Sequence, residues 1–307
     1  MDREAIGKGI GNAMQPAAGR VRPPAVAGAF YPDDPAILNR ALTEYFMAAQ
    51  KKVQEIPSCG IVVPHAGYMY SGHVAAYSYL ASKNEIKKAG TVVVIGPNHT
   101  GSGPRGISVS SSTWSTPLGL ARADTEFAKA LADEKISVDE SAHEEEHSIE
   151  VQIPFLQYIK PDVMIVPVCM RNQDKESAVH LATKIYETAR KLKRNIFIVA
   201  SSDFSHYVPA DIGERADKYI IESILKLDVD GFYERIYETG ASLCGYGPIA
   251  ALMTYSKLNN CEGGQLLKFG SSGDINASYS QVVDYAAITF PRPASKKANE
   301  KKKRPKK

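Results

Sequence analysis

Side chains that can bind a metal or move a proton occur at the ends of predicted structural elements in four segments of the chain. His65 and His99 each follow an apolar run rich in β-branched residues, GIVVP and TVVVIG. Asp203 and His206 follow a third run, NIFIVA, and Cys244 lies just before a predicted apolar helix. Imidazole, carboxylate and thiolate groups are ligands that proteins use for iron, zinc and copper. These five side chains are therefore the first candidates for a functional site.

The apolar runs predict the elements that position the candidate residues. They indicate buried strands, at residues 60–64, 91–96, 163–168, 195–200 and 282–290. The first four runs are apolar continuously rather than alternately, which is typical of strands covered on both faces. Intervening stretches predict helices, at residues 35–50, 72–82, 124–134, 177–192 and 249–258. This alternation predicts a single α/β domain with a mostly parallel central sheet flanked by helices.

Parallel strands bring their carboxyl ends to the same edge of a sheet, where ligands of open α/β folds bind. We therefore expect His65, His99 and the segment 203–206 to meet there, although they are far apart in the chain. Two histidines with one anionic ligand are typical of non-haem iron(II), imidazole also suits zinc, and thiolate suits copper(I). The residue types alone do not determine which of these metals binds. His206 is the expected acid–base group, because imidazole titrates near neutral pH.

Other features beside these segments are expected to shape the cleft. Cys244 precedes a helix N-terminus, whose partial positive charge favours the thiolate form. Residues 143–147 match the zinc-protease pattern HExxH, but they fall in a polar loop before the next apolar pattern, which argues against a helical zinc site. The side chains expected to line the cleft are Tyr68, Asn98, His147, Phe204 and Tyr246.

The composition is that of a globular protein in a reducing compartment. Hydrophobic residues make up 44% and charged residues 23% of the 307 residues. No apolar run reaches the roughly 20 residues of a membrane-spanning helix. The four cysteines are widely spaced without a CxxC pair, and the first residues lack the apolar stretch of a secretory signal. We therefore expect a cytoplasmic protein that does not associate with a membrane.

The net charge of +3 is unevenly distributed along the chain. Residues 295–307 contain eight Lys or Arg and one Glu, which leaves 29 basic and 33 acidic residues elsewhere. An acidic body lacks the basic surface of a nucleic-acid-binding protein, so only the tail could make such a contact. We expect a disordered extension at residues 1–20, a folded domain at 21–292 and a disordered basic tail at 293–307.

Seven motifs follow one another along the chain: RPPAVAGAFYP (22–32), VPHAGYMYSG (63–72), IGPNHTG (95–101), WSTPLG (114–119), EHSIEVQIPFLQ (146–157), SSDFSHY (201–207) and CGYGP (244–248). Taken in this order, they resemble the motifs of the Memo (mediator of cell motility) family, whose archaeal and bacterial members are called AmmeMemoRadiSam system protein B. The resemblance covers residues 22–290 and leaves out both ends of the chain. Seven motifs in one order make a specific match, whereas a single motif would be weak.

The resemblance implies a fold similar to that of the class III extradiol ring-cleaving dioxygenases, which use non-haem iron. It implies a metal site formed by His65, His99 and Cys244, with Asp203 and His206 beside it. A cysteine then stands where the ring-cleaving enzymes have a carboxylate ligand. Animal members of the family are linked to copper or iron redox chemistry and to phosphotyrosine-peptide binding. Prokaryotic members resemble partners of an AMMECR1-like protein and a radical-SAM protein.

Three hypotheses for the function follow. The first is a redox or dioxygenase-like protein that binds iron(II) or copper through His65, His99 and Cys244. In this hypothesis Asp203 and His206 are the catalytic groups. The sequence does not identify the substrate or show whether any turnover occurs. The second is a non-catalytic module that holds a peptide or partner protein in the cleft, where Gly-rich turns offer backbone N–H groups to an anion. The third is a metal-free cysteine hydrolase, in which His206 or His65 activates Cys244.

Overall fold

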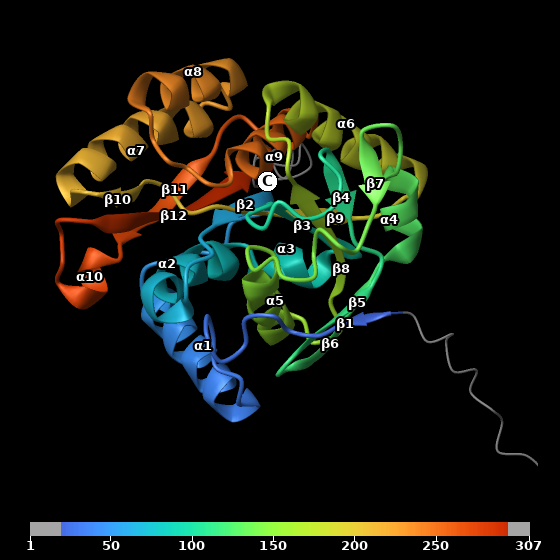
Figure 1. Cartoon of the computed structure of the whole chain (residues 1–307), viewed down its shortest axis with the longest axis horizontal. Coiled ribbons are helices and arrows are strands. Elements are labelled where there is room, and N and C mark those ends of the chain that lie inside the picture. Colours follow the sequence, from blue (N-terminus) through green and yellow to red (C-terminus); the bar gives the residue numbers. More distant parts are fainter. Residues whose placement is uncertain (1–19, 294–307) are drawn as a thin grey trace, which may run out of the picture.

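Twelve strands form one hydrogen-bonded sheet in the computed structural model, which describes residues 20–293 (Figure 1). The predicted extension at 1–20 and the predicted tail at 293–307 lie outside the described residues, apart from Arg20 and Pro293. The strands are β1 (Val21–Arg22), β2 (Ser58–Val63), β3 (Thr91–Pro97), β4 (Ile107–Val109), β5 (Thr113–Thr116), β6 (Gly119–Ala123), β7 (Ile136–Val138), β8 (Met164–Met170), β9 (Ile196–Ser201), β10 (His206–Val208), β11 (Gln265–Ser271) and β12 (Val282–Pro291).

The centre of the sheet is parallel. β6, β8, β3, β9 and β2 lie side by side in this order, and each runs parallel to the next. Every residue of β2, β3 and β9 is buried, as their continuous apolar runs predict. Antiparallel strands flank this block, because β12 pairs with β2 and β4 pairs with β8. The predicted α/β fold with a mostly parallel central sheet is confirmed.

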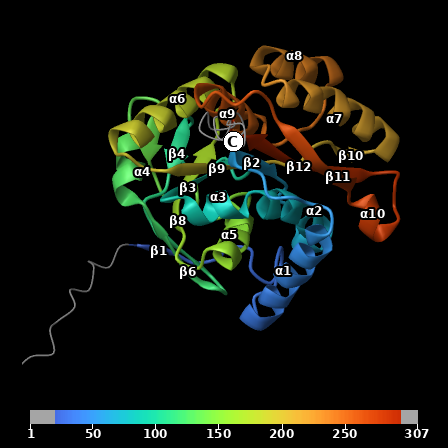
Figure 2. The same cartoon turned by 180° about the vertical axis from the view of Figure 1, so that it is seen from behind.

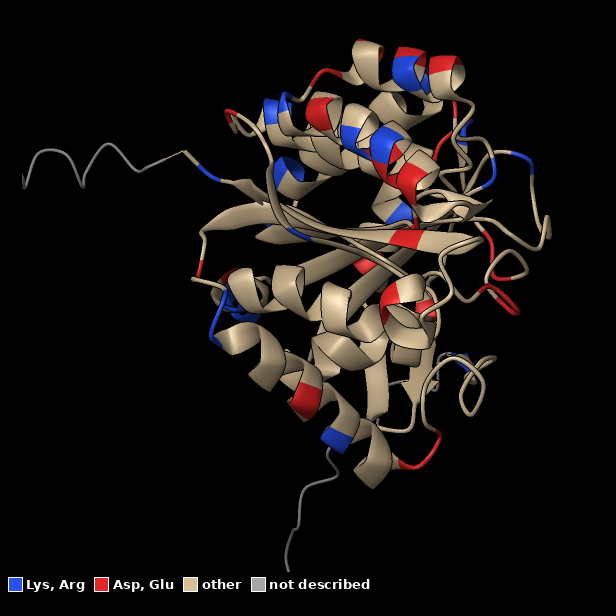
Figure 3. Ribbon diagram, turned by 90° about the vertical axis from the view of Figure 1, so that its left-hand side faces the viewer, with Lys and Arg blue, Asp and Glu red and all other residues tan. Residues whose placement is uncertain are grey.

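Helices cover both faces of the sheet (Figures 1 and 2). They are α1 (Pro35–Gln50), α2 (Tyr68–Ala81), α3 (Lys83–Lys88), α4 (Thr125–Leu131), the short 3-10 helix η1 (Glu150–Gln152), α5 (Ile153–Ile159), α6 (Lys175–Lys191), α7 (Ala210–Leu225), α8 (Val229–Thr239), α9 (Tyr246–Leu258) and α10 (Gly273–Asn276). α1, α2, α3 and α5 pack into one hydrophobic core, and α4, α6, α7, α8 and α9 pack into a second core on the opposite face. Charged residues lie mainly on the outer helices and loops (Figure 3). No helix within the described residues is long and apolar enough to cross a membrane.

The predicted strands and helices are present, but some of their ends differ. α2 begins at Tyr68, four residues before its predicted start. The backbone of Gly67 is extended (ψ 140°), and the N–H of Tyr68 donates to the carbonyl of Phe30 at 2.7 Å. This contact with the N-terminal segment fixes the first turn of the helix, and apolar periodicity alone does not reveal it. α7 and α8 are additional to the prediction and bury Ile224 and Phe232 in the second core.

A buried ion pair attaches the N-terminal segment to the loop at residues 143–149. Arg22 Nη1 lies 2.6 Å from Glu150 Oε2, and both side chains are almost wholly buried. The Arg22 guanidinium also donates to two backbone carbonyls of the loop. Glu150 accepts further hydrogen bonds from two backbone N–H groups that follow Arg22 and from the hydroxyl of Tyr31. Because a buried charge is costly without such partners, this network determines where the loop lies.

Two buried carboxyl groups lie behind the segment 203–206. Asp217 on α7 accepts hydrogen bonds from the N–H of Ser205 at 3.0 Å and from its hydroxyl at 2.7 Å. Asp284 on β12 bonds to the same segment through its backbone, but its Oδ2 atom has no hydrogen-bond partner among the described residues. Burial, followed by the charge of Asp217, raises the pKa of Asp284 to about 8, and burial also raises the pKa of Asp217. This carboxyl pair therefore holds a proton at neutral pH.

The variant Asp284→Asn should lose part of the pH dependence of stability. A carboxyl group with a raised pKa in the folded state stabilises that state at low pH, and the contribution is lost as the pH rises from about 4 to about 8. Over this range the free energy of unfolding, measured in urea, should fall less in the variant than in the wild type. We expect a difference on the order of 1–3 kcal/mol. Asp211→Asn, which changes an exposed residue of α7, is the control. An unchanged pH dependence in Asp284→Asn would contradict the assignment.

Candidate metal centre

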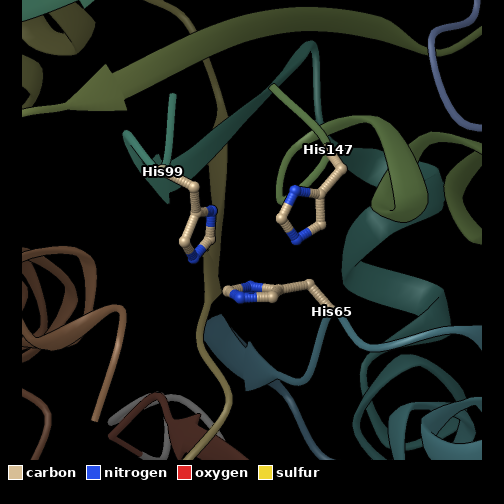
Figure 4. Close-up of side chains that lie close together, drawn as sticks. All are labelled: His65, His99 and His147. Atoms are coloured by element: carbon tan, nitrogen blue, oxygen red, sulfur yellow. The ribbon is translucent and has the colours of Figure 1, made fainter. Parts of the chain in front are cut away.

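Three imidazole rings meet at the carboxyl edge of the parallel strands (Figure 4). His65 follows β2, His99 follows β3, and His147 comes from the loop before η1. One ring nitrogen of each residue lies within 4.8 Å of those of the other two. The ring centroids are 5.1, 5.4 and 4.6 Å apart for the pairs 65–99, 65–147 and 99–147. These residues, here called the His triad, are close enough for one cation to bind between them.

A buried carboxylate orients two members of the His triad. Glu146 Oε2 accepts the backbone N–H of His99 at 2.6 Å, and Oε1 lies 2.8 Å from His99 Nδ1 and 3.6 Å from His147 Nδ1. Burial acts to raise the pKa of Glu146, but the hydrogen bond and charge of His99 outweigh it and lower the pKa to about 2. An ionised carboxylate only accepts hydrogen bonds, so Nδ1 of His99 carries the proton. The other ring nitrogen, Nε2, is then the one available to a metal.

A chain of hydrogen bonds orients His65 in the same way. The hydroxyl of Ser201 donates to the carbonyl of Ser148 at 2.7 Å, so it must accept from His65 Nδ1 at 2.9 Å. Gln152 Nε2 donates to the same hydroxyl at 2.9 Å. Nε2 of His65 is therefore bare. Burial, followed by the charges of His99 and the other nearby histidines, lowers the pKa of His65 well below its usual range and keeps the ring neutral.

Cys244 lies against the His triad. Its Sγ atom is 3.1 Å from His65 Nε2 and accepts the backbone N–H of Asp203 at 3.2 Å. The expectation that the helix N-terminus favours the thiolate is wrong for the metal-free protein. Burial, followed by the charge of Asp203, raises the pKa of the Cys244 thiol despite the hydrogen bond from the backbone. The low dielectric around the sulfur outweighs the partial charge of the helix.

Asp203 and His206 lie beside this cluster. Asp203 Oδ1 accepts the N–H of His65 at 2.8 Å, and Oδ2 is 4.0 Å from His65 Nε2. Burial raises the pKa of Asp203 to about 6, although hydrogen bonds from the backbone oppose it. His206 Nδ1 lies 2.8 Å from the carbonyl of Ser242, so Nδ1 carries the proton and Nε2 is free.

The side chains predicted to line the cleft have different surroundings. Tyr68 is buried among aromatic rings, and its hydroxyl donates to the carbonyl of Val151. Phe204 is wholly buried in the second core. Asn98 caps the turn that follows His99. Tyr246 packs against Tyr233, whereas His147 belongs to the His triad.

The two histidines of the HExxH match do not converge. His143 lies in a turn with its ring against Trp114, at a centroid distance of 5.8 Å, whereas His147 lies in the His triad. Burial lowers the pKa of His143 to about 4. In the described chain this segment has no α-helical geometry, which agrees with the interpretation that it is not a helical zinc site.

Gln173 fixes the turn that carries Cys244. Its Nε2 atom donates to the carbonyl of Cys244 at 2.9 Å, and its Oε1 atom accepts the N–H of Gly247 at 2.9 Å. The backbone carbonyl of Gln173 is in turn held by the hydroxyl of Tyr233 at 2.7 Å. Sequence reasoning missed Gln173, because no pattern near it indicates this role. It also missed Glu146, although that residue opens one of the seven motifs.

Comparison with known proteins identifies the family. Residues 22–289 match the Memo-like protein family. The chain belongs to the Memo family. MEMO1 family proteins of Methanosarcina barkeri and Archaeoglobus fulgidus are 46% and 44% identical to it over 269 and 270 residues. These matches cover 87% and 88% of this chain and 99% of each relative.

Two further matches extend the comparison. A MEMO1 family protein of Methanopyrus kandleri is 42% identical over 282 residues, which is 88% of this chain and 99% of the relative. A solved structure of an uncharacterized protein from Escherichia coli K12 aligns with 73% of this chain and with 98% of its own chain. The sequence identity is 14% and the TM-score is 0.44, so this likeness is too distant for any conclusion. Membership of the Memo family agrees with the α/β fold expected from the motifs.

The variant Gln173→Ala should loosen the Cys244 turn. Loss of two hydrogen bonds that are partly buried should lower the free energy of unfolding by about 1–3 kcal/mol. We also expect alkylation of Cys244 by iodoacetamide to be several-fold faster than in the wild type, as followed by peptide mass spectrometry. Asn172→Ala is the matched control, because the Asn172 side chain accepts only a long hydrogen bond from the adjacent loop at 3.4 Å. An unchanged alkylation rate would show that Gln173 does not hold the turn.

Proposed function

We propose that this Memo-family protein binds one redox-active metal ion at the carboxyl edge of its sheet. His65, His99 and Cys244 would be the ligands, and His147 a fourth donor. The observation that carries the proposal is that one ring nitrogen from each of the three imidazoles lies within 4.8 Å of the other two, with a thiol 3.1 Å from His65 Nε2. Carboxylate and hydroxyl partners occupy the Nδ1 atoms of His99 and His65, which leaves Nε2 free to bind a metal.

The donor set fits iron(II) or copper. Two imidazoles with one anionic ligand suit non-haem iron(II), and a thiolate with imidazoles suits copper. A bound cation displaces the proton of a thiol that coordinates it, which offsets the effect of burial on Cys244. When bound, the ion would supply redox chemistry or polarise a ligand. His147 suits the role of a neutral fourth donor, because burial lowers the pKa of its ring.

The proposal gives Asp203 and His206 separate tasks. Asp203 holds the backbone of His65 in place and can exchange a proton near neutral pH, because burial raises its pKa to about 6. His206 presents a free Nε2 atom, because its Nδ1 proton is directed at the carbonyl of Ser242. This nitrogen can accept a proton from a bound molecule, which is the role of a general base.

The contact between Cys244 and His65 also favours a second candidate, a metal-free cysteine hydrolase. A sulfur 3.1 Å from an unprotonated ring nitrogen is the arrangement of a nucleophile and its base. Thiol labelling in the presence of a chelator distinguishes the two functions. Rapid labelling of Cys244 by an electrophilic substrate analogue without metal would support the hydrolase, and protection of Cys244 by added metal would support the metal centre.

Metal analysis of anaerobically purified protein tests the ligand set. We expect about one iron or copper ion per wild-type chain and at least a tenfold lower content in His65→Ala, His99→Ala and Cys244→Ala, because each removes a ligand. His147→Ala should weaken binding less if it supplies only a fourth donor. His180→Ala is the control, since His180 pairs with Asp133 away from the His triad. Equal metal content in all variants would refute the ligand assignment.

Glu146→Gln should weaken metal binding without removing a ligand. The glutamine side chain has a similar shape but no charge, so it orients His99 less strongly and makes its Nε2 less basic. Losses of about 10–100-fold in affinity are typical when such a partner is changed. Competition with a chromogenic chelator measures the effect. Glu140→Gln, which changes a partly buried carboxylate of the same region, is the control. An affinity equal to that of the wild type would rule out this role for Glu146.

A further inference from the structure

Two thiols outside the metal centre face each other in the interior. Cys59 is the second residue of β2, and Cys261 follows the end of α9. Their Sγ atoms are 3.3 Å apart, and both side chains are buried, with only 7% of Cys261 exposed. We propose that Cys59 and Cys261 form a modification site, a dithiol that a small disulfide oxidises to an intramolecular disulfide. The proposal is independent of the metal centre, because neither thiol is among its donors.

The positions of the two residues allow the bond to form. A disulfide has an S–S distance of about 2.05 Å, so the sulfurs must approach by about 1.3 Å. Cys59 is held in the sheet, whereas Cys261 lies in the loop between α9 and β11. The preceding residue, Asn260, has a left-handed backbone with φ 58°, and the N–H of Cys261 donates to the carbonyl of Ser256 at 3.0 Å. Side-chain rotation and a small shift of this loop can supply the movement and leave the strand pairing intact.

The pairing is specific among the four cysteines, all of which lie within the described residues. Cys169 has a backbone carbonyl as its sulfur partner, that of Pro97 at 3.7 Å. Cys244 lies at the opposite end of β2, beside His65. A strand advances about 3.3 Å per residue, so the six residues from Cys59 to His65 separate the two sulfur sites by on the order of 20 Å. Cys59 and Cys261 are thus the pair expected to join.

The surroundings of the pair favour reaction. Cys59 Sγ also lies 3.2 Å from the hydroxyl of Ser256. The hydrogen bond with Cys261, assisted by the charge of Arg292, lowers the pKa of Cys59 although burial opposes it. The same hydrogen bond raises the pKa of Cys261. Cys59 therefore loses its proton more readily than Cys261, and a thiolate is the species that attacks a disulfide.

Cys261 is the thiol of the pair that lies nearer the surface, since it is 7% exposed and Cys59 is 0% exposed. A hollow of about 590 Å³ borders the loop of Cys261, and Glu262, Gly263, Gly264 and Arg292 are part of its lining. The Arg292 guanidinium donates to the carbonyl of Ser58, the residue before Cys59, at 3.0 Å. Arg292 Nε also lies 3.8 Å from Glu85 Oε2, and Glu262 belongs to the same lining, so the hollow carries both charges and suits a zwitterionic disulfide of the glutathione type. The reagent that the site would take is therefore a small, carboxylate-bearing disulfide.

The reaction balances through two exchange steps. Cys261, the more exposed thiol, passes its proton along the hydrogen bond to the Cys59 thiolate and attacks one sulfur of the small disulfide. This step forms a mixed disulfide and releases one thiolate, which takes up the proton from Cys59. Cys59 then attacks the Cys261 sulfur, forms the Cys59–Cys261 bond and releases the second thiolate. Two protein thiols are oxidised, one small disulfide is reduced, and the two protons end on the released thiols. The bond joins β2, which leads to His65, to the loop at the end of α9, the helix that begins just after Cys244.

Peptide mapping of the full chain tests the proposal. Reduced wild-type protein is incubated with oxidised glutathione, alkylated with iodoacetamide in denaturant and digested without reductant. We expect a cross-linked peptide pair containing Cys59 and Cys261, two hydrogens lighter than the sum of the reduced peptides, with Cys169 and Cys244 alkylated. The melting temperature should rise by several degrees after oxidation, because the cross-link constrains the unfolded chain.

Three variants make the result decisive. Cys59→Ala and Cys261→Ala should lose both the cross-link and the rise in melting temperature, whereas Cys169→Ala, which changes another buried cysteine, should keep both. Alkylation of both Cys59 and Cys261 in oxidised wild type would overturn the proposal. So would a cross-link that involves Cys244, or a glutathione adduct on Cys261 that never resolves. If Cys59→Ala fails to fold, the wild-type map and Cys261→Ala decide the question.

Discussion

The buried carboxylate of Glu146 is the interaction on which the geometry of the site depends. It accepts both the backbone N–H and the ring Nδ1 of His99, and it lies close to Nδ1 of His147. A buried charge without partners is strongly destabilising, so the loop of residues 143–149 and the end of β3 must stay together. The same hydrogen bonds direct the Nε2 atom of His99 toward His65. Stability of the loop and orientation of the donors therefore have one cause.

A second buried charge holds that loop from the other side. The ion pair between Arg22 and Glu150 joins the N-terminal segment to the loop, and Tyr31 completes the set of partners. Phe30, in the same segment, packs its ring against His147 at a centroid distance of 4.7 Å. Residues near the start of the domain thus support a site built from strands in its middle. The carboxyl edge of the sheet brings the donors together, and these two buried carboxylates set their orientation.

β2 and α9 have a thiol and an imidazole near one pair of their ends and two thiols near the other pair. At the carboxyl edge of the sheet, β2 leads to His65 and α9 begins just after Cys244. At the opposite edge, Cys59 and Cys261 lie against each other near the other ends of the same elements. The surroundings decide how each thiol behaves, because burial beside Asp203 raises the pKa of Cys244, whereas a hydrogen bond within the thiol pair lowers that of Cys59.

Continuous apolar runs were sufficient to predict the central strands, because a strand covered on both faces needs apolar residues at every position. The same runs end at His65, His99 and Asp203, so their meeting at one edge followed from parallel pairing. The sequence did not indicate Gln173 or the role of Glu146, because hydrogen bonds between distant segments leave no periodic pattern. Nor did it predict the protonated state of Cys244, since the helix N-terminus is visible in the sequence but the desolvation that outweighs it is not. Local patterns thus determined the central strands and the edge of the sheet where the donor side chains gather. Tertiary packing decided the orientation and the protonation state of these side chains, because both properties depend on which distant groups surround them and exclude water.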